Sequence, residues 1–267
     1  MSGSSGSKKD RQRAARERLQ AEREAAARKA KVRGRVLVSA AIVSSLALVG
    51  GVAWYVTQPT ADAAAAEGPL VRPAHTTGKD GVVVPYGKAG SEHVLTVWLD
   101  PRCPYCAGAE TGLGRTMKQQ ADDGEYRIEY HFATFLDGSL GGKGSKRALN
   151  ALGAAVNESP EKFMEYMNVL YANHPEKESD DKFGSTATLL ELADKVDGLR
   201  TPAFNKAVKE LTYMPWVEKV SQQFYEQDIN GTPTFLIDGK KIQVNSGKGI
   251  ESISPEQFTE LVGENIK

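Results

Sequence analysis

The chain has 267 residues, 40% hydrophobic and 25% charged, which is the composition of a globular protein with room for one sizeable domain or two small ones. It contains only two cysteines, which excludes a disulfide-rich scaffold, so its stability must come from an apolar core. The net charge is zero, with 34 Lys and Arg against 34 Asp and Glu, but it is unevenly distributed. Residues 1–35 carry twelve Lys and Arg against four Asp and Glu, and the remaining residues carry 22 against 30.

A basic segment occupies residues 1–35. From residue 8 onward it consists mainly of Ala, Arg, Glu and Lys, which favour a helix, and Leu19 and Val32 are its only large aliphatic side chains. Such a segment suits the anionic cytoplasmic surface of a membrane. A nucleic-acid contact is the alternative, but we expect the membrane surface and no nucleic-acid partner.

An uncharged apolar run follows at residues 36–56, which is 21 residues long and ends in Trp54-Tyr55. It is long enough for one transmembrane helix in the lipid bilayer. The neighbouring Lys and Arg precede it, so the positive-inside rule predicts a cytoplasmic N-terminus and an extracytoplasmic remainder at the cell membrane. A signal peptide cleaved among the small residues 61–66 is the alternative, although the long basic lead favours retention.

Residues 57–81 are rich in Ala, Gly and Pro and predict a linker, so the folded domain is expected over residues 82–267. An apolar, β-branched run at residues 93–99 predicts a buried strand. A helix to about residue 122 and a second, alternating strand over residues 126–136 should follow. This order indicates a βαβ unit with parallel strands.

Residues 143–228 carry helical signals and no strand pattern. Within them, Ser159-Pro160 and Thr201-Pro202 each combine an N-cap with proline at the first helical position. A β-hairpin is predicted over residues 231–244, and Ser254-Pro255 should begin a closing helix. The whole pattern predicts an α/β fold with an inserted helical subdomain.

The two cysteines form the motif Cys103-Pro104-Tyr105-Cys106 at the junction of the first strand and its helix. Disulfide exchange needs a thiolate, and a free cysteine with a pKa of about 8.5 is mostly protonated at neutral pH. The unpaired N–H groups and positive dipole end of a helix start favour the anion. We therefore expect Cys103 to be the exposed, low-pKa nucleophile and Cys106 to resolve the mixed disulfide, with Pro104 and Tyr105 tuning the redox properties.

Two other uses of the cysteines are less consistent with the sequence. A metal site would need further ligands, and His75, His93, His131 and His174 are scattered without ligand spacing. A purely structural disulfide would close too small a loop to stabilise the chain much. We expect neither a metal nor another cofactor.

The CPYC motif after an apolar strand, the stretch Gly231-Thr232-Pro233-Thr234-Phe235 before a hairpin, and the helical block between them resemble thioredoxin-fold proteins of the DsbA type. The resemblance covers roughly residues 82–267. It implies that Thr232-Pro233 is a cis peptide beside the dithiol that presents the Thr232 backbone to an extended substrate. The basic lead and single anchor resemble the membrane-tethered members in actinobacteria.

The sequence departs from this family pattern at a position where an acidic residue is common. Many thioredoxins and some DsbA-type proteins carry a buried acid six residues before the first cysteine, where this chain has Val97. Asp100 is a partial replacement for that acid or, as we favour, the N-terminal cap of the active-site helix. The Pro-Tyr dipeptide also occurs in glutaredoxins, so it does not determine the reduction potential.

Three functions are compatible with these features. The first is an extracytoplasmic thiol oxidase that donates disulfides to reduced, unfolded exported proteins and is reoxidised by a membrane partner, DsbB-like or VKOR-like. The second is a reductase serving cytochrome maturation or disulfide repair, and the third is a non-catalytic peptide-binding or chaperone module. An extracytoplasmic location favours oxidation, because that compartment lacks the reducing thiol pools of the cytosol.

Overall fold

The computed structural model describes residues 60–227 and 229–266. The predicted basic segment 1–35 and the predicted transmembrane helix 36–56 both lie outside these residues. In the described part of the chain, no helix combines the length and the apolar character that a membrane crossing requires.

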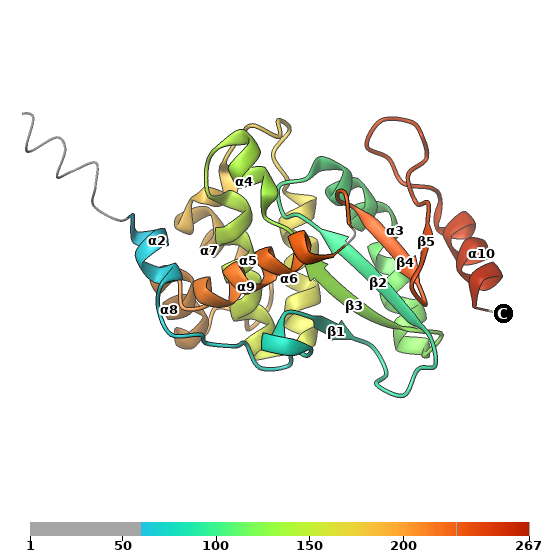
Figure 1. Ribbon diagram of the computed structural model, residues 1–267, viewed down its shortest axis with the longest axis horizontal. Coiled ribbons are helices and arrows are strands. Elements are labelled where there is room, and N and C mark those ends of the chain that lie inside the picture. Colours follow the sequence, from blue (N-terminus) through green and yellow to red (C-terminus); the bar gives the residue numbers. More distant parts are fainter. Residues whose placement is uncertain (1–59, 228, 267) are drawn as a thin grey trace, which may run out of the picture. The chain divides into compact units, whose positions relative to one another are not determined.

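A five-stranded sheet in the order β1-β3-β2-β4-β5 organises the fold (Figure 1). Its strands are β1 (Val84–Tyr86), β2 (Val94–Leu99), β3 (Arg127–Phe132), β4 (Thr234–Ile237) and β5 (Lys240–Ile242). Strands β2 and β3 pair in parallel and are joined by helix α3 (Pro104–Asp123), which confirms the predicted βαβ unit. Strands β4 and β5 form the predicted antiparallel hairpin, and β4 pairs with β2.

The second predicted strand is shorter than expected. It ends at Phe132, and helix α4 (Phe135–Leu140) begins where the alternating pattern had suggested more strand, so that part of the prediction was wrong. The last ladder contact is made by the Ala133 N–H, which donates to the Leu99 carbonyl at 2.8 Å. The Leu136 N–H does not continue the ladder, because it donates to the carboxylate of Asp100 at 3.3 Å.

The two faces of the sheet pack against different layers. Leu95, Val97 and Leu99 of β2 alternate along the strand and are fully buried in the main core with α3. On the opposite face, Trp98 lies in a smaller cluster with Phe224 of α9 (Met214–Glu226), the helix that packs against β3 in Figure 1. The strand that leads to the CPYC motif is therefore buried on both sides.

The predicted helical block lies between β3 and β4. After α4 it contains α5 (Gly144–Glu158), α6 (Pro160–Ala172), the short 3-10 helix η2 (Lys182–Gly184), α7 (Thr186–Ala193), α8 (Pro202–Glu210) and α9. Ser159 and Thr201 are N-caps whose side chains accept backbone N–H groups, as predicted. The closing helix α10 (Pro255–Asn265) starts with a capping box at Ser254.

The described part of the predicted linker is attached to the domain and is not a free tether. Helix α2 (Ala61–Ala66) packs on α9, and both Asp62 carboxylate oxygens accept from the Arg147 guanidinium, at 2.6 and 2.9 Å. Further along the chain lies the 3-10 helix η1 (Lys79–Gly81). Its Gly81 carbonyl accepts a hydrogen bond from the buried Trp216 indole N–H at 2.7 Å. The linker was predicted from its amino-acid composition, and composition does not reveal long-range contacts made by single residues.

We expect Asp62→Asn to loosen helix α2. The substitution removes a bidentate, half-buried ion pair, and a loss of about 1–2 kcal/mol should accelerate hydrogen exchange of the α2 amides by about 5- to 30-fold. Hydrogen exchange measured by mass spectrometry checks this, with Glu67→Gln as the control because Glu67 is exposed in the same segment. Equal exchange in both variants would contradict an anchoring role for Asp62.

Candidate active site at the start of helix α3

The structure places the two cysteines on the first turn of α3. Cys103 is the N-cap residue in extended conformation, with φ −76° and ψ 120°, and Pro104 is the first helical residue. Both cysteines are free thiols. Cys106 is fully buried, and Cys103 is only 4% exposed, so the expectation of an exposed Cys103 was wrong in degree. Cys103 is still the more exposed residue of the two.

The surroundings shift the pKa values of the two thiols in opposite directions. The pKa of Cys103 is lowered, mainly because the Cys106 thiol and backbone N–H donate hydrogen bonds to its sulfur, which outweighs the effect of burial. The pKa of Cys106 is raised well above its ordinary value, first because of burial and then because the Cys103 sulfur lies beside it. The pair therefore contains one group suited to be a thiolate and one suited to remain a thiol.

The loop before β4 completes the site next to Cys103. The Thr232–Pro233 peptide bond is cis, and the Cys103 thiol donates to the Thr232 carbonyl oxygen at 3.4 Å. A groove of about 250 Å³ runs from this loop along β5, and Tyr105, which is 45% exposed, lies at its edge. The structure thus brings together Cys103, Tyr105, Thr232 and Pro233 from opposite ends of the domain sequence.

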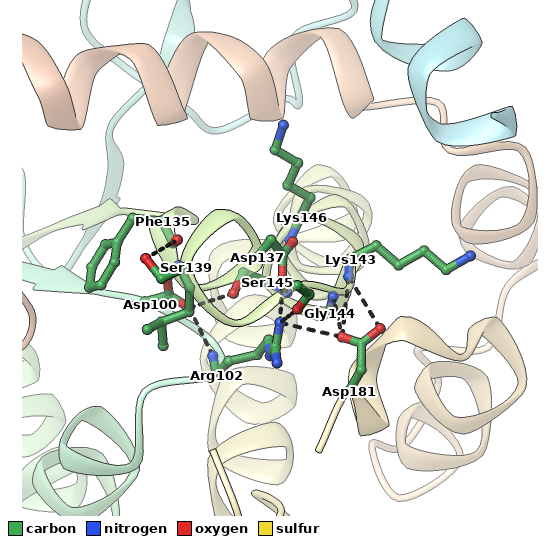
Figure 2. Close-up of polar contacts among 12 residues, drawn as sticks. Asp100, Arg102, Phe135, Asp137, Ser139, Lys143, Gly144, Ser145, Lys146 and Asp181 are labelled. Atoms are coloured by element: carbon green, nitrogen blue, oxygen red, sulfur yellow. Dashed lines mark hydrogen bonds and ion pairs between the residues drawn. The ribbon is translucent and has the colours of Figure 1, made fainter. Parts of the chain in front are cut away.

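Asp100 does not cap helix α3, so the favoured interpretation of this residue was wrong. The N-cap is Cys103, and Asp100 is fully buried. One of its carboxylate oxygens accepts from the Arg102 N–H at 2.9 Å and the Ser145 hydroxyl at 2.6 Å (Figure 2). Its own backbone N–H points to the Cys106 sulfur at 3.5 Å. Burial raises the pKa of this carboxyl to about 7, so Asp100 is a buried acid at the dithiol.

Arg102, the residue before Cys103, was not identified in the sequence as part of the site. Its side chain is 1% exposed, and one guanidinium nitrogen lies 2.9 Å from the Asp137 carboxylate and 3.6 Å from that of Asp181. Figure 2 shows this group beside the first turn of α5, where Asp137 also accepts from the Ser145 N–H. A buried cation therefore links the start of α3 to the helical insertion, and only the fold brings its two acids together.

Glu110 is a second buried acid, one helical turn after Cys106. It is 3% exposed, and neither of its carboxylate oxygens has a hydrogen-bond partner. The hydroxyls of Tyr130 and Tyr171 are likewise buried without partners. Burial raises the pKa of Glu110 to about 8. The sequence could have indicated that Glu110 is buried beside Cys106, because Cys106, Glu110 and Leu113 have the spacing of residues on one face of a helix.

The four histidines do not converge. His131 stacks on Trp98 with ring centroids 4.5 Å apart, His93 contacts Asp238 at 2.7 Å, and His174 contacts the backbone near the dithiol. Among residues 60–227 and 229–266, no group of three His, Cys, Asp or Glu side chains has an arrangement that could hold a metal ion.

Solved structures share this fold. MdbA from Actinomyces oris, a thiol-disulfide oxidoreductase, is 23% identical with a TM-score of 0.57, and the match covers 75% of this chain and 95% of MdbA. BdbD from Bacillus subtilis is 19% identical with a TM-score of 0.57, covering 73% and 96%. Reduced DsbA from Mycobacterium tuberculosis is 22% identical with a TM-score of 0.54, covering 68% and 91%. At these identities the structures establish the thioredoxin-like fold with its helical insertion.

Sequence comparison gives the family. Disulfide bond formation protein D of Bacillus subtilis (strain 168) is 23% identical over 158 residues, which are 59% of this chain and 68% of that protein. The family model described as Thioredoxin matches residues 79–264, a range that contains both cysteines and the Thr232-Pro233 loop. The chain therefore belongs to the thioredoxin family, and its relatives are DsbA-type oxidoreductases.

Proposed function

We propose that this chain is an extracytoplasmic thiol:disulfide oxidoreductase that donates disulfides to exported proteins through Cys103 and Cys106. The observation that carries the proposal is the pair of free cysteines on the first turn of α3, with Cys103 against the cis Thr232–Pro233 peptide; a lowered pKa at Cys103 and a raised pKa at Cys106 agree with it. A lowered pKa increases the fraction of Cys103 present as the reactive thiolate at neutral pH and makes Cys103 a good leaving group. The similarity to a disulfide bond formation protein supports the same chemistry.

The reaction transfers two electrons from substrate to enzyme, and of the two protons that the substrate dithiol loses, one ends on Cys106 and the other is released to solvent. A substrate thiolate attacks Cys103 Sγ of the oxidised enzyme, a mixed disulfide forms, and the Cys106 sulfur leaves and is protonated. The second substrate thiolate then attacks the substrate sulfur of the mixed disulfide, which forms the substrate disulfide and releases Cys103 as a thiolate. The groove beside Thr232 and Pro233 is the proposed site for the extended substrate segment.

The proposed location is the outer side of a cell membrane, with residues 36–56 as the anchor and residues 1–35 in the cytoplasm. The 21-residue uncharged run and the basic lead support this topology. The matched structures include proteins from Actinomyces oris and Mycobacterium tuberculosis, which supports the actinobacterial type. Protease treatment of intact cells tests it: the domain should be digested, and a protected domain would contradict this topology.

Each donated disulfide leaves the enzyme reduced, so the proposal includes a membrane partner of the DsbB or VKOR kind that restores the Cys103–Cys106 disulfide. Exported proteins that are still reduced and unfolded are the proposed substrates. Accumulation of the reduced enzyme after loss of such a partner would support this cycle.

The direction of the reaction is tested by the reduction potential. Because the lowered Cys103 pKa stabilises the reduced form, we expect a potential near the oxidising end of the family, about −120 mV, and a lower melting temperature with the disulfide closed. Equilibration with glutathione buffers and thermal unfolding of both forms measure these quantities. A potential near about −270 mV would favour the reductase. Absence of any exchange would favour the non-catalytic module.

A further inference from the structure

The connection between β5 and α10 folds back on itself as a small hairpin, residues 244–253, which we call the rim hairpin (Figure 1). The Ile253 N–H donates to the Val244 carbonyl at 2.8 Å, and the Ser246 N–H donates to the Glu251 carbonyl at 3.0 Å. Backbone hydrogen bonds therefore hold the two arms of the hairpin together, both at its base and near its tip.

The rim hairpin rests on the active-site helix α3 at two glycines. A Cβ atom placed on Gly108 would overlap the Ile250 carbonyl oxygen, and one placed on Gly112 would overlap the Ser252 hydroxyl oxygen. The hairpin therefore contacts the backbone of the helix at positions where no other residue fits. Because the two glycines are four residues apart, these contacts lie on one face of α3.

Two exposed apolar side chains lie close together at this contact. Tyr105 precedes Gly108 by three residues on α3, a spacing that places the two Cβ positions about 5–6 Å apart. The Ile250 Cβ lies 3.7 Å from the Cβ position of Gly108. The Cβ atoms of Tyr105 and Ile250 are therefore at most about 10 Å apart, close enough for both side chains to contact one apolar group. They are 45% and 49% exposed, and they are two of the six large hydrophobic side chains that are exposed in the described part of the chain.

This apolar pair lies beside the proposed substrate groove. Tyr105 lines the groove together with residues 232–235 and 241–245, and the last of these residues belong to the rim hairpin. The hairpin itself carries one basic and one acidic side chain, Lys248 and Glu251, so it has no net charge. The rim hairpin therefore offers the groove an apolar contact and not a charged one.

A substrate that enters the groove as an extended chain reaches the pair at a definite distance from its own cysteine. Gly108 follows Cys103 by five residues, which is about 7.5 Å along a helix. An extended chain rises about 3.3 Å per residue, and its side chains return to the same face at every second residue. The side chain two residues from the substrate cysteine is therefore the one placed to meet Tyr105 and Ile250.

We propose that the rim hairpin is a substrate-selecting element: Ile250, seated on α3, forms with Tyr105 a contact for a large apolar side chain two residues from the substrate cysteine. The inference rests on the proposed function, because it names the class of substrate that meets Cys103. The occupant is an extended segment of an unfolded protein. A folded protein buries most of its large apolar side chains, so the contact favours chains that have not yet folded.

The test measures how fast the oxidised full-length protein is reduced by an excess of single-cysteine peptides. The peptides are identical except that the residues two before and two after the cysteine are both Leu or both Ser. One peptide thiolate attacks Cys103 and forms a mixed disulfide, and a second peptide thiolate releases it as a peptide dimer, so two peptide thiols are oxidised for each enzyme disulfide reduced. The Leu peptide should react about tenfold faster, which corresponds to roughly 1.4 kcal/mol and is less than complete burial of a leucine contributes. Thiol alkylation at set times and mass spectrometry measure both rates.

Variants of the contact should remove most of this preference for the Leu peptide. Ile250→Ser removes the apolar side chain, whereas Val71→Ser is its control, because Val71 is another exposed β-branched residue and belongs to the segment before β1. Gly108→Ala should act in the same direction, since the added methyl group displaces the Ile250 carbonyl. Gly263→Ala is the control for it, because the Cβ position of this helical glycine has open space around it. If Gly108→Ala does not fold, Ile250→Ser alone decides the question.

Three outcomes would overturn the inference. The first is equal rates of the two peptides with the wild type, and the second is a preference that Ile250→Ser leaves unchanged. The third is a wild type that dimerises through this surface, seen as a shift in sedimentation that Ile250→Ser abolishes, which would assign the apolar pair to a second copy of the chain. None of the three affects the proposed function while the wild type exchanges disulfides.

A wild type that exchanges no disulfides defeats the proposed function but still leaves the contact measurable. The same two peptides with serine in place of cysteine are then added, and the Ile250 methyl groups are followed by NMR. A shift caused by the Leu peptide and not by the Ser peptide would support the contact, and no shift with either peptide would overturn it.

Discussion

Cys106→Ala is expected to accumulate as mixed disulfides with reduced, unfolded proteins, whereas the wild type should not. The trapped bond joins Cys103 to the substrate, and in the wild type the neighbouring Cys106 thiol can cleave it by attacking the Cys103 sulfur, which is the reverse of the first donation step. Removing a preorganised intramolecular attacker should slow that release by about 1000-fold or more. The variant is incubated with an unfolded test protein whose single cysteine carries a small leaving thiol in a mixed disulfide, so that Cys103 displaces that thiol, and non-reducing electrophoresis measures the adduct.

Cys103→Ala is the matched control, since it changes the other thiol of the same turn. It should form no adduct, because the remaining Cys106 is fully buried and its pKa is raised, which leaves it protonated and inaccessible. Adducts formed equally by both variants would show that Cys106 is also a nucleophile. No adduct with either variant would contradict the assignment of disulfide exchange to this motif.

The regular parts of the fold were predictable because their signals are local. The Ser159, Thr201 and Ser254 caps depend on residues within one helical turn, and the β4–β5 hairpin depends on a short turn. The position of Cys103 at the start of α3 follows from the strand before it and the proline after it. Such features need no knowledge of the tertiary structure.

The features that were missed depend on contacts between distant segments. Asp100 has the sequence position of a cap, but the Ser145 hydroxyl from α5 and the Leu136 N–H hold its carboxylate in the core. Arg102 resembles a surface arginine until Asp137 and Asp181 are brought to it by the helical insertion. No local pattern encodes a partner 35 or more residues away.

The missing acid at Val97 has a structural counterpart in two other acids. Val97 is fully buried, while Asp100 lies on the strand side of Cys106 and Glu110 lies one turn further along α3. Both carboxyls have raised pKa values, near 7 and 8, so both can hold a proton at neutral pH. Two buried acids therefore lie around Cys106, and each holds a proton fully or in part at neutral pH.

Glu110→Gln is expected to flatten the pH dependence of stability. The folded-state pKa of Glu110 is raised from 4.5 to about 8, so the folded protein binds the proton more tightly than the unfolded chain. Stability from this group is complete below pH 4.5 and is lost as the pH rises through about 8. Relative to wild type, the variant should gain on the order of 4 kcal/mol in unfolding free energy between pH 5 and pH 9.

Urea unfolding of reduced wild type and Glu110→Gln at several pH values measures this difference. Asp100 also has a raised pKa, but it is present in both proteins and cancels in the comparison. Asp123→Asn is the control, because it removes an exposed acid from the end of the same helix and should leave the pH profile unchanged. A difference between Glu110→Gln and wild type that stays constant with pH would mean that Glu110 is ionised in the folded protein.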